Sequence, residues 1–252
     1  TRYFWIFGDD DLPKAGVIEK IFNLLRYEMP DLVYLQSEWH AKISGPNQGV
    51  LVDNLVYSVM SQLQFARRVN VWLTFISGMI VNLESYKRSV EIVNIRRFTN
   101  TSLVQLGWIL PVLANEGNFL YVGTPCVLAR QGNTGGYELL KVFGNNFPTI
   151  VSNVLQSDLK LARAICHRCA ISFLPDLLWG ARYGRIGDFV HEDPATALQF
   201  QFRGTFIYYL LFIPIAYWPR PLARLSLVVA HFLSRLQTAI DRMRESLFRI
   251  ND

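Results

Sequence analysis

The chain has 252 residues, 51% of them apolar and 18% charged, which is enough apolar sequence for a buried core. Its net charge of +5 is concentrated at one end, because residues 203–252 hold seven arginines and three acids. A basic excess confined to one segment argues against a general nucleic-acid-binding surface and favours a local anionic partner, such as a membrane face. The three cysteines, Cys126, Cys166 and Cys169, exclude a disulfide framework.

The first 36 residues predict a strand, a helix and a second strand. Residues 3–7 are a short apolar run, typical of a buried strand. Leu12-Pro13 is expected to open a helix that has Asp11 as its N-cap and ends at Pro30. Residues 31–36 predict the second buried strand. This order indicates a βαβ unit with a parallel pair of strands.

The middle of the chain mixes both kinds of element. The patterns predict helices at 51–65 and 103–113, a broken apolar segment at 71–81, and a strand pair or one bent strand at 119–129. Residues 131–136 are glycine-rich but lack the ending of a phosphate-binding loop, so a plain turn is the leading interpretation. From about residue 150 the pattern is helical only. The expected fold class is therefore α/β over residues 1–150, followed by an all-helical extension over residues 151–252.

Asp9, Asp10 and Asp11 directly follow the first expected strand. Mg²⁺ and Mn²⁺ prefer hard carboxylate oxygens, and such a cation stabilises the charge on a departing diphosphate as a Lewis acid. In open α/β sheets, ligands bind outside the carboxyl ends of strands, which is where this triplet lies. The alternative is a solvated turn with an N-cap, but a turn needs only one of the three acids. A helical DDxxD metal motif is excluded, because these acids follow a strand.

Residues 3–16, YFWIFGDDDLPKAG, resemble the W-x-x-G-D-D-D-x-x-x-x-G segment of family 2 glycosyltransferases with the GT-A (Rossmann-like) fold. The similarity is greatest to bacterial surface-polysaccharide, abequosyltransferase-like enzymes. Residues 73–78, LTFISG, resemble the acceptor-side strand of that family, and residues 130–137, RQGNTGGY, resemble a segment that often closes its catalytic domain. The resemblance covers residues 1–150. It implies transfer of a sugar from a nucleotide-diphosphate donor to a glycan or lipid-linked acceptor, dependent on Mn²⁺ or Mg²⁺.

The same resemblance implies roles for the acidic triplet. Asp9 and Asp10 would contact the nucleotide-sugar donor, and Asp9 and Asp11 would bind the metal. The general base stays unassigned, because many relatives carry a Glu-Asp pair where this chain has residues 100–105, NTSLVQ, without an acid. An ordinary surface residue is the leading interpretation for each remaining candidate, which are Glu38, His40, Asp53 and Glu84.

Two features leave other functions open. The family's N-terminal strands, which cradle the nucleoside, have no counterpart before Thr1, so this chain is expected to be the later part of a longer protein. A non-catalytic or truncated relative that binds or scaffolds is therefore the alternative. Another metal-dependent phosphoryl-transfer enzyme is a third and weaker hypothesis.

The end of the chain has two interpretations. Residues 206–218 form an apolar, aromatic run that is too short to span a membrane, and an arginine-rich helix with an apolar stripe follows it. Residues 203–252 are expected either to lie in a membrane interface or to pack on the catalytic domain or a second copy. With the first interpretation, the protein is expected to be cytoplasmic and peripheral on the inner face of the cell membrane.

Overall fold

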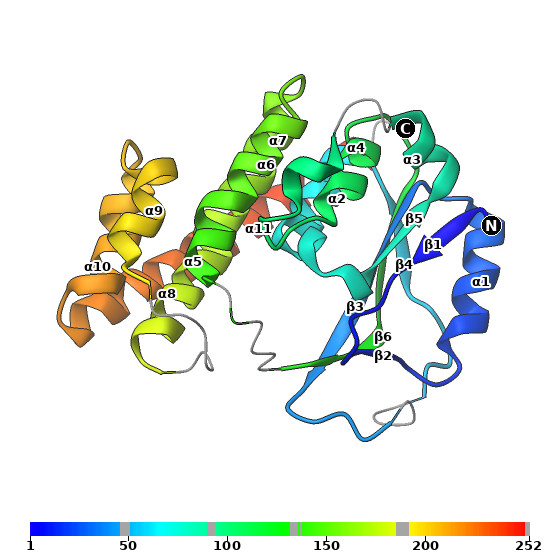
Figure 1. The fold of residues 1–252 in the computed structure, drawn as a ribbon, viewed down its shortest axis with the longest axis horizontal. Helices are drawn as coiled ribbons and strands as arrows, with labels where there is room; N and C mark the ends of the chain where they lie inside the picture. Colours follow the sequence, from blue (N-terminus) through cyan, green and yellow to red (C-terminus); the bar gives the residue numbers. More distant parts are fainter. Residues whose placement is uncertain (46–50, 90–93, 132–135, 137, 185–191, 250–252) are drawn as a thin grey trace. The chain divides into compact units, whose positions relative to one another are not determined.

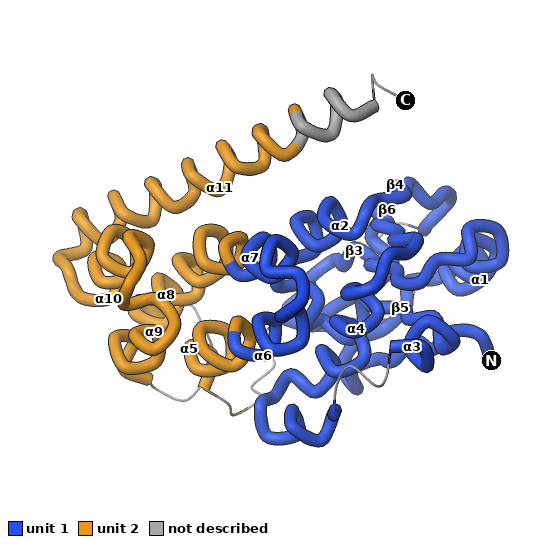
Figure 2. Tube along the Cα trace, turned by 90° about the horizontal axis from the view of Figure 1, so that it is seen from above, with its two compact units in different colours: residues 1–134, 149–166 blue, residues 135–148, 167–252 orange. Residues whose placement is uncertain are grey.

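The computed structural model describes residues 1–45, 51–89, 94–131, 136, 138–184 and 192–249. The chain divides into two compact units, residues 1–134 with 149–166 and residues 135–148 with 167–252 (Figure 2). The first unit is mixed α/β and the second is helical, which confirms the expected α/β class in this coarse form. The domain boundary near residue 150 remains a prediction.

A six-stranded sheet is the framework of the first unit (Figure 1). The strands β1 (Tyr3–Trp5), β5 (Met79–Asn82), β3 (Leu32–His40) and β6 (Phe119–Arg130) lie side by side in that order, and both β2 (Leu12–Pro13) and β4 (Tyr57–Met60) pair with β6. Only β3 and β6 pair in parallel. The predicted directly paired βαβ unit was wrong, because β5 lies between β1 and β3 and is antiparallel to both.

The long strand β6 is bent, as one of the two sequence interpretations proposed. Leu35 pairs with Val122 and Ser37 with Val127, so the residues in between on β6 form a bulge against β3. Pro125 lies in this bulge, where its missing N–H costs the sheet no hydrogen bond. On the other side of β6, β4 pairs before the bulge and β2 after it. The bend therefore carries the end of β6 to the segment that follows β1.

The helix α1 (Val17–Glu28) begins later than the sequence predicted. Leu12 and Pro13 pair with β6 as a short strand, so Asp11 is not an N-cap. Gly16 precedes the helix with φ 74°, a left-handed conformation that glycine adopts without a steric cost. The buried face of α1 packs on one face of the sheet, in a core formed by Val17, Ile21, Leu24, Leu25, Val33, Leu35, Ile80, Leu120 and Val122.

The opposite face of the sheet carries the alternate residues of the same strands. There Phe119 contacts Phe65 of α2 (Gln62–Val69), with ring centroids 5.5 Å apart. The other short elements of this part are η1 (Asn70–Thr74), η2 (Ile76–Gly78), α3 (Leu83–Ser89), η4 (Ile95–Phe98) and α4 (Leu106–Leu113). Two predictions were wrong here, because β4 and α2 replace the single helix over residues 51–65, and residues 73–78 form 3₁₀ turns rather than a strand.

Beyond residue 138 the described chain forms only helices. They are α5 (Leu139–Lys141), η5 (Val142–Asn146), α6 (Phe147–Val154), α7 (Leu159–Arg168), η6 (Cys169–Phe173), α8 (Leu174–Arg182), α9 (Pro194–Phe202), η7 (Tyr208–Phe212), α10 (Ile213–Tyr217) and α11 (Arg220–Arg249). Over the part of the chain that is described, no helix has the length and apolar content needed to cross a membrane. Most of the glycine-rich turn at 131–136 lies outside the described residues.

Candidate functional site

The acidic triplet lies at the carboxyl end of β1, as the sequence predicted. Asp9 and Asp10 form a turn, and Asp11 stands directly before β2. The backbone N–H of Asp11 donates to the carbonyl of Gly8 across 3.3 Å, which closes the turn. Asp9 is exposed, Asp10 is half-buried and Asp11 is buried. The three carboxyl groups therefore occupy three different environments.

Asp11 joins three separate segments through its carboxyl group. Its Oδ2 accepts a 2.6 Å hydrogen bond from the hydroxyl of Ser77, and its Oδ1 accepts a 3.1 Å bond from the backbone N–H of Arg130. The Ser77 hydroxyl in turn accepts from the N–H of Gly8 across 2.8 Å. The turn after β1, the η2 segment and the end of β6 are therefore fixed to one carboxylate.

Burial raises the pKa of the Asp11 carboxyl above its ordinary value. The hydrogen bonds from Ser77 and Arg130 oppose this increase, while the nearby charges of Asp10 and Asp9 add to it. A cation bound beside the triplet would favour the ionised form of Asp11. Asp11 is thus positioned rigidly, but its negative charge is not balanced by the protein groups around it.

Asp9 and Asp10 differ from Asp11, since no hydrogen bond or ion pair joins their carboxyl groups to another described residue. The missing side chain of Gly8 leaves room for the carboxyl oxygens of two of the acids. A Cβ atom at residue 8 would lie 3.2 Å from Asp11 Oδ2 and 3.4 Å from Asp10 Oδ1. Both oxygens therefore lie beside the same point of the backbone, where only glycine avoids a tight contact.

Within the described ranges, no three His, Cys, Asp or Glu side chains are grouped so that they could hold a metal ion. An ionised carboxylate has about four lone-pair positions, so Asp11 retains acceptor capacity beyond its two hydrogen bonds. Two carboxylates with this capacity fit a hard divalent cation that takes its other ligands from water and phosphate oxygens. The donor chemistry of the triplet therefore fits Mg²⁺ or Mn²⁺ only together with a phosphate-bearing ligand.

Glu38 and His40 lie near the acidic turn. His40 of β3 is paired with Arg130 of β6, and the N–H of Arg130 binds Asp11. Glu38 forms an ion pair with Lys14 at 2.8 Å, and its other carboxylate oxygen lies 2.9 Å from Nε2 of His40. The hydrogen bond from Lys14, a residue only 6% exposed, is the main reason why the pKa of Glu38 lies below its ordinary value. A carboxylate held ionised in this way is a weak proton acceptor.

The structure does not bring Asp53 and Glu84 to the acidic turn. Glu84 lies in the first turn of α3, which follows β5. The last residue of β5 pairs with the first residue of β1, so Glu84 lies at the end of the sheet where β1 begins. Its carboxylate forms an ion pair with Lys87 at 2.9 Å. Asp53 is exposed ahead of β4, and its carbonyl accepts a 2.7 Å hydrogen bond from Lys20. Both residues are exposed on the surface.

An aromatic cluster lies close to the partners of Asp11. The ring of Trp39, next to His40, is 5.7 Å from that of Trp72 and 5.1 Å from that of Phe75. Trp39 and Trp72 are 38% and 37% exposed. Half-exposed aromatic rings offer a flat apolar surface on which a sugar or base can stack. The sequence patterns did not predict this cluster or the roles of Ser77 and Arg130, although they indicated a broken apolar segment at 71–81.

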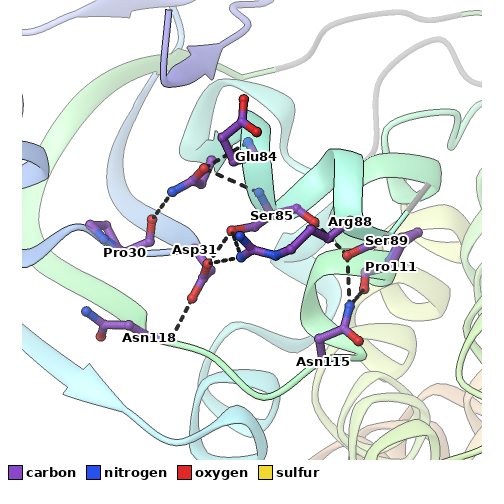
Figure 3. Close-up of polar contacts among 10 residues, drawn as sticks. Pro30, Asp31, Glu84, Ser85, Arg88, Ser89, Pro111, Asn115 and Asn118 are labelled. Atoms are coloured by element: carbon purple, nitrogen blue, oxygen red, sulfur yellow. Dashed lines mark hydrogen bonds and ion pairs between the residues drawn. The ribbon is translucent and has the colours of Figure 1, made fainter.

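A second polar cluster, at the other end of the sheet, contrasts with the acidic turn (Figure 3). Asp31, just before β3, accepts hydrogen bonds from the Ser85 hydroxyl and from the backbone N–H of Asn118, the latter at 2.8 Å. Arg88 forms an ion pair with Asp31 at 3.6 Å. Both oxygens of Asp31 are therefore engaged by the protein itself, and this cluster is interpreted as structural.

Comparison with known proteins adds no relative. No protein-family model matches the sequence, and no curated protein matches it significantly. The resemblance to glycosyltransferases therefore rests on the short motifs quoted above.

Proposed function

We propose that the chain is a metal-dependent glycosyltransferase that moves a sugar from a nucleotide-diphosphate donor to a glycan or lipid-linked acceptor. The observation that carries the proposal is the acidic turn. Three acidic residues follow one another beyond the carboxyl end of a strand. The carboxyl group of one is fixed by the protein, and those of the other two have no protein partner among the described residues. Such a concentration of like charge costs stability, which favours a functional explanation over a plain turn.

Within this proposal the three acids have distinct roles. Asp11 and Asp9 hold Mn²⁺ or Mg²⁺, and Asp9 and Asp10 face the donor. The cation, when bound, neutralises charge that develops on the departing diphosphate. Ser77 and the N–H of Arg130 keep the Asp11 carboxylate in one orientation, so that no side-chain freedom is lost when the donor binds.

The acceptor side of the proposed site lies around Glu38 and His40. Among the four base candidates, only Glu38 and His40 lie near the acidic turn, and a Glu38 oxygen lies 2.9 Å from Nε2 of His40. Trp39 and Trp72 give a half-exposed surface for the sugar or the base. The GT-A fold, which the resemblance implies, belongs to the same proposal, and so does a place on the inner face of the cell membrane, which the composition of residues 203–252 favours.

A non-catalytic binding or scaffolding protein is the second candidate function. The specific observation in its favour is that Glu38 is held ionised by Lys14, which leaves it a poor general base. The absence of a three-ligand metal group from the described part of the chain points the same way.

One assay separates the two candidates. We expect Mn²⁺-dependent hydrolysis of at least one nucleotide sugar from a panel, lost in Asp9→Ala and in Asp11→Ala. Glu84→Ala is the matched control, because it removes an acid at the opposite end of the sheet and should keep full activity. Activity that is equal in all four proteins would overturn the proposed site. Nucleotide-sugar binding without hydrolysis in the unaltered chain would favour the scaffolding candidate.

A further inference from the structure

The helix α11 buries a side of small and polar residues and leaves a stripe of large apolar side chains exposed. Its buried positions are small or polar, with Ala223 and Ala230 fully buried and Ser226 9% exposed. Five of its large apolar side chains are 46% to 63% exposed, namely Leu222, Leu225, Val228, Phe232 and Leu236, while Leu227, Val229, Leu233 and Ile240 are half-buried. A helix of a soluble bundle normally buries its large apolar residues instead.

A buried ion pair fixes this orientation of α11. Arg168 at the end of α7 pairs with Asp241 at 2.9 Å, and both side chains are about nine-tenths buried. The same guanidinium donates to the carbonyl of Ser234 at 3.1 Å and to the hydroxyl of Thr238 at 3.2 Å. These contacts need the polar side of α11 to face inward. The apolar side is therefore held outward by specific bonds.

The charged side chains beside the exposed apolar stripe of α11 are all positive. Between residues 220 and 240 the helix has Arg220, Arg224 and Arg235 and no acid. The first acid along the helix, Asp241, is buried against Arg168. On the adjacent helix α8, Asp176 contacts His231 at 2.8 Å, so this acid already has a partner. The outer side of α11 thus combines an apolar stripe with cationic groups.

A groove of about 720 Å³ adjoins the stripe, lined among others by Trp179, Arg220, Arg224 and His231. Two arginines at the rim of an open, mostly apolar groove suit a phosphate group that is attached to an apolar body. Trp218 and Tyr217, just before the helix, are 46% and 47% exposed. Aromatic side chains at this position are typical of the headgroup level of a lipid bilayer.

We propose that the outer side of α11 docks on an anionic phospholipid surface. The five apolar side chains would enter the headgroup–acyl boundary, and Arg220, Arg224 and Arg235 would contact lipid phosphates. A second copy of the chain fits less well. Leu222, Leu225, Val229, Phe232 and Leu236 follow a heptad spacing, but dimeric coiled coils pair opposite charges beside the seam, and this side has no acid to pair with its arginines.

The experiment is flotation of the 252-residue protein with neutral phosphatidylcholine vesicles and with vesicles that also contain about 30% phosphatidylglycerol. We expect binding to the anionic vesicles only, and weaker binding at high salt. The variant Leu225→Gln/Phe232→Gln/Leu236→Gln should partition about 100-fold less, because three half-exposed side chains no longer gain from burial. Arg224→Glu/Arg235→Glu should also lose binding.

A matched control keeps the test specific. Ile18→Gln/Phe22→Gln/Val56→Gln removes three apolar side chains that are 62%, 58% and 70% exposed in the first unit, so it should bind like the unaltered protein. Circular dichroism should be unchanged in every variant, because only exposed side chains are replaced. Failure of the unaltered protein to bind, or equal loss of binding in the control, would overturn the proposal. So would a lipid-free dimer in sedimentation velocity that the α11 triple variant disperses. None of these outcomes depends on the glycosyltransferase proposal.

Discussion

Two carboxylates mark the two ends of the same sheet, and the protein treats them differently. Asp31, where β3 begins, has a hydroxyl, a backbone N–H and a guanidinium as partners for its oxygens. Asp11, beyond the end of β1, has two hydrogen bonds but stands beside two further acids that repel it. In the first arrangement, protein groups engage both oxygens of the carboxylate. The second leaves negative charge for something else to neutralise, which is the physical difference between a structural cluster and a candidate binding site.

The largest effect on the free energy of unfolding should come from changes in the Asp31 cluster. We expect Asp31→Ala to lower the free energy of unfolding by about 3 kcal/mol, because the N–H of Asn118 and the Ser85 hydroxyl lose their acceptor. Urea denaturation measures this directly. Gly117→Ala should also destabilise the protein, because a Cβ atom there would lie 2.6 Å from Asp31 Oδ2. A change below about 1 kcal/mol in Asp31→Ala would show that this cluster does not stabilise the fold.

An intermediate effect is expected where the acidic turn is fixed to the protein. Ser77 is fully buried, and its hydroxyl links the Gly8 N–H to the Asp11 carboxylate. Ser77→Ala should lower the free energy of unfolding by about 2 kcal/mol, because two buried groups lose a partner. Ser58→Ala, on the half-exposed strand β4, is a control that should cost less. If the two variants were equally stable, Asp11 would not be held as described.

The pH dependence should reveal the uncompensated charge. The pKa of Asp11 is raised in the folded protein, so the folded state binds more protons than the unfolded chain above the ordinary pKa of 3.8. Stability due to this group is therefore complete at lower pH and declines as the pH rises from about 4 through the folded pKa. Asp11→Asn should flatten that decline in a series of thermal unfolding curves. An identical slope in the variant and the unaltered protein would contradict this assignment.

The smallest effect on stability should come from the two acids without protein partners. Asp9→Ala and Asp10→Ala are expected to change the free energy of unfolding by no more than about 0.5 kcal/mol, because no contact with the described residues is lost. Each removes one like charge beside Asp11, so a slight gain in stability is the expected direction. Thermal unfolding without divalent cations measures this. A loss comparable to that of Ser77→Ala would assign these acids a structural role.

The sequence predicted the parts of the fold that local patterns determine. The strands β1, β3 and β6 and the acidic turn were expected at nearly their observed positions, because apolar runs and turn residues are local signals. The start of α1 was wrong, since Leu12-Pro13 and an acid imitate a helix start while the pairing of these residues with β6 is a long-range contact. The strand order was wrong for the same reason, because β5, which comes later in the chain than both β1 and β3, inserts between them.

The candidate site was only partly predictable. The three acids were visible as a motif, but their different burial depends on Ser77 and Arg130, which lie 66 and 119 residues away from Asp11. The sequence alone also did not distinguish between the four general-base candidates, which were Glu38, His40, Asp53 and Glu84. Strand register then placed the first two near the turn and the other two elsewhere. The exposure of the apolar side of α11 could not be predicted from the sequence, because an apolar stripe does not indicate whether other parts of the protein cover it.

The most direct test of the central claim is a Mn²⁺ titration followed by electron paramagnetic resonance, with and without a nucleoside diphosphate. The geometry predicts weak Mn²⁺ binding alone and tighter binding with the diphosphate, because the protein supplies only carboxylates and the ligand must complete the coordination shell. Binding should be lost in Asp9→Ala and in Asp11→Ala and retained in Glu84→Ala. Mn²⁺ binding that is unaffected by either substitution in the triplet, or no binding in the presence of the diphosphate, would contradict the assignment of this turn as a metal and diphosphate site.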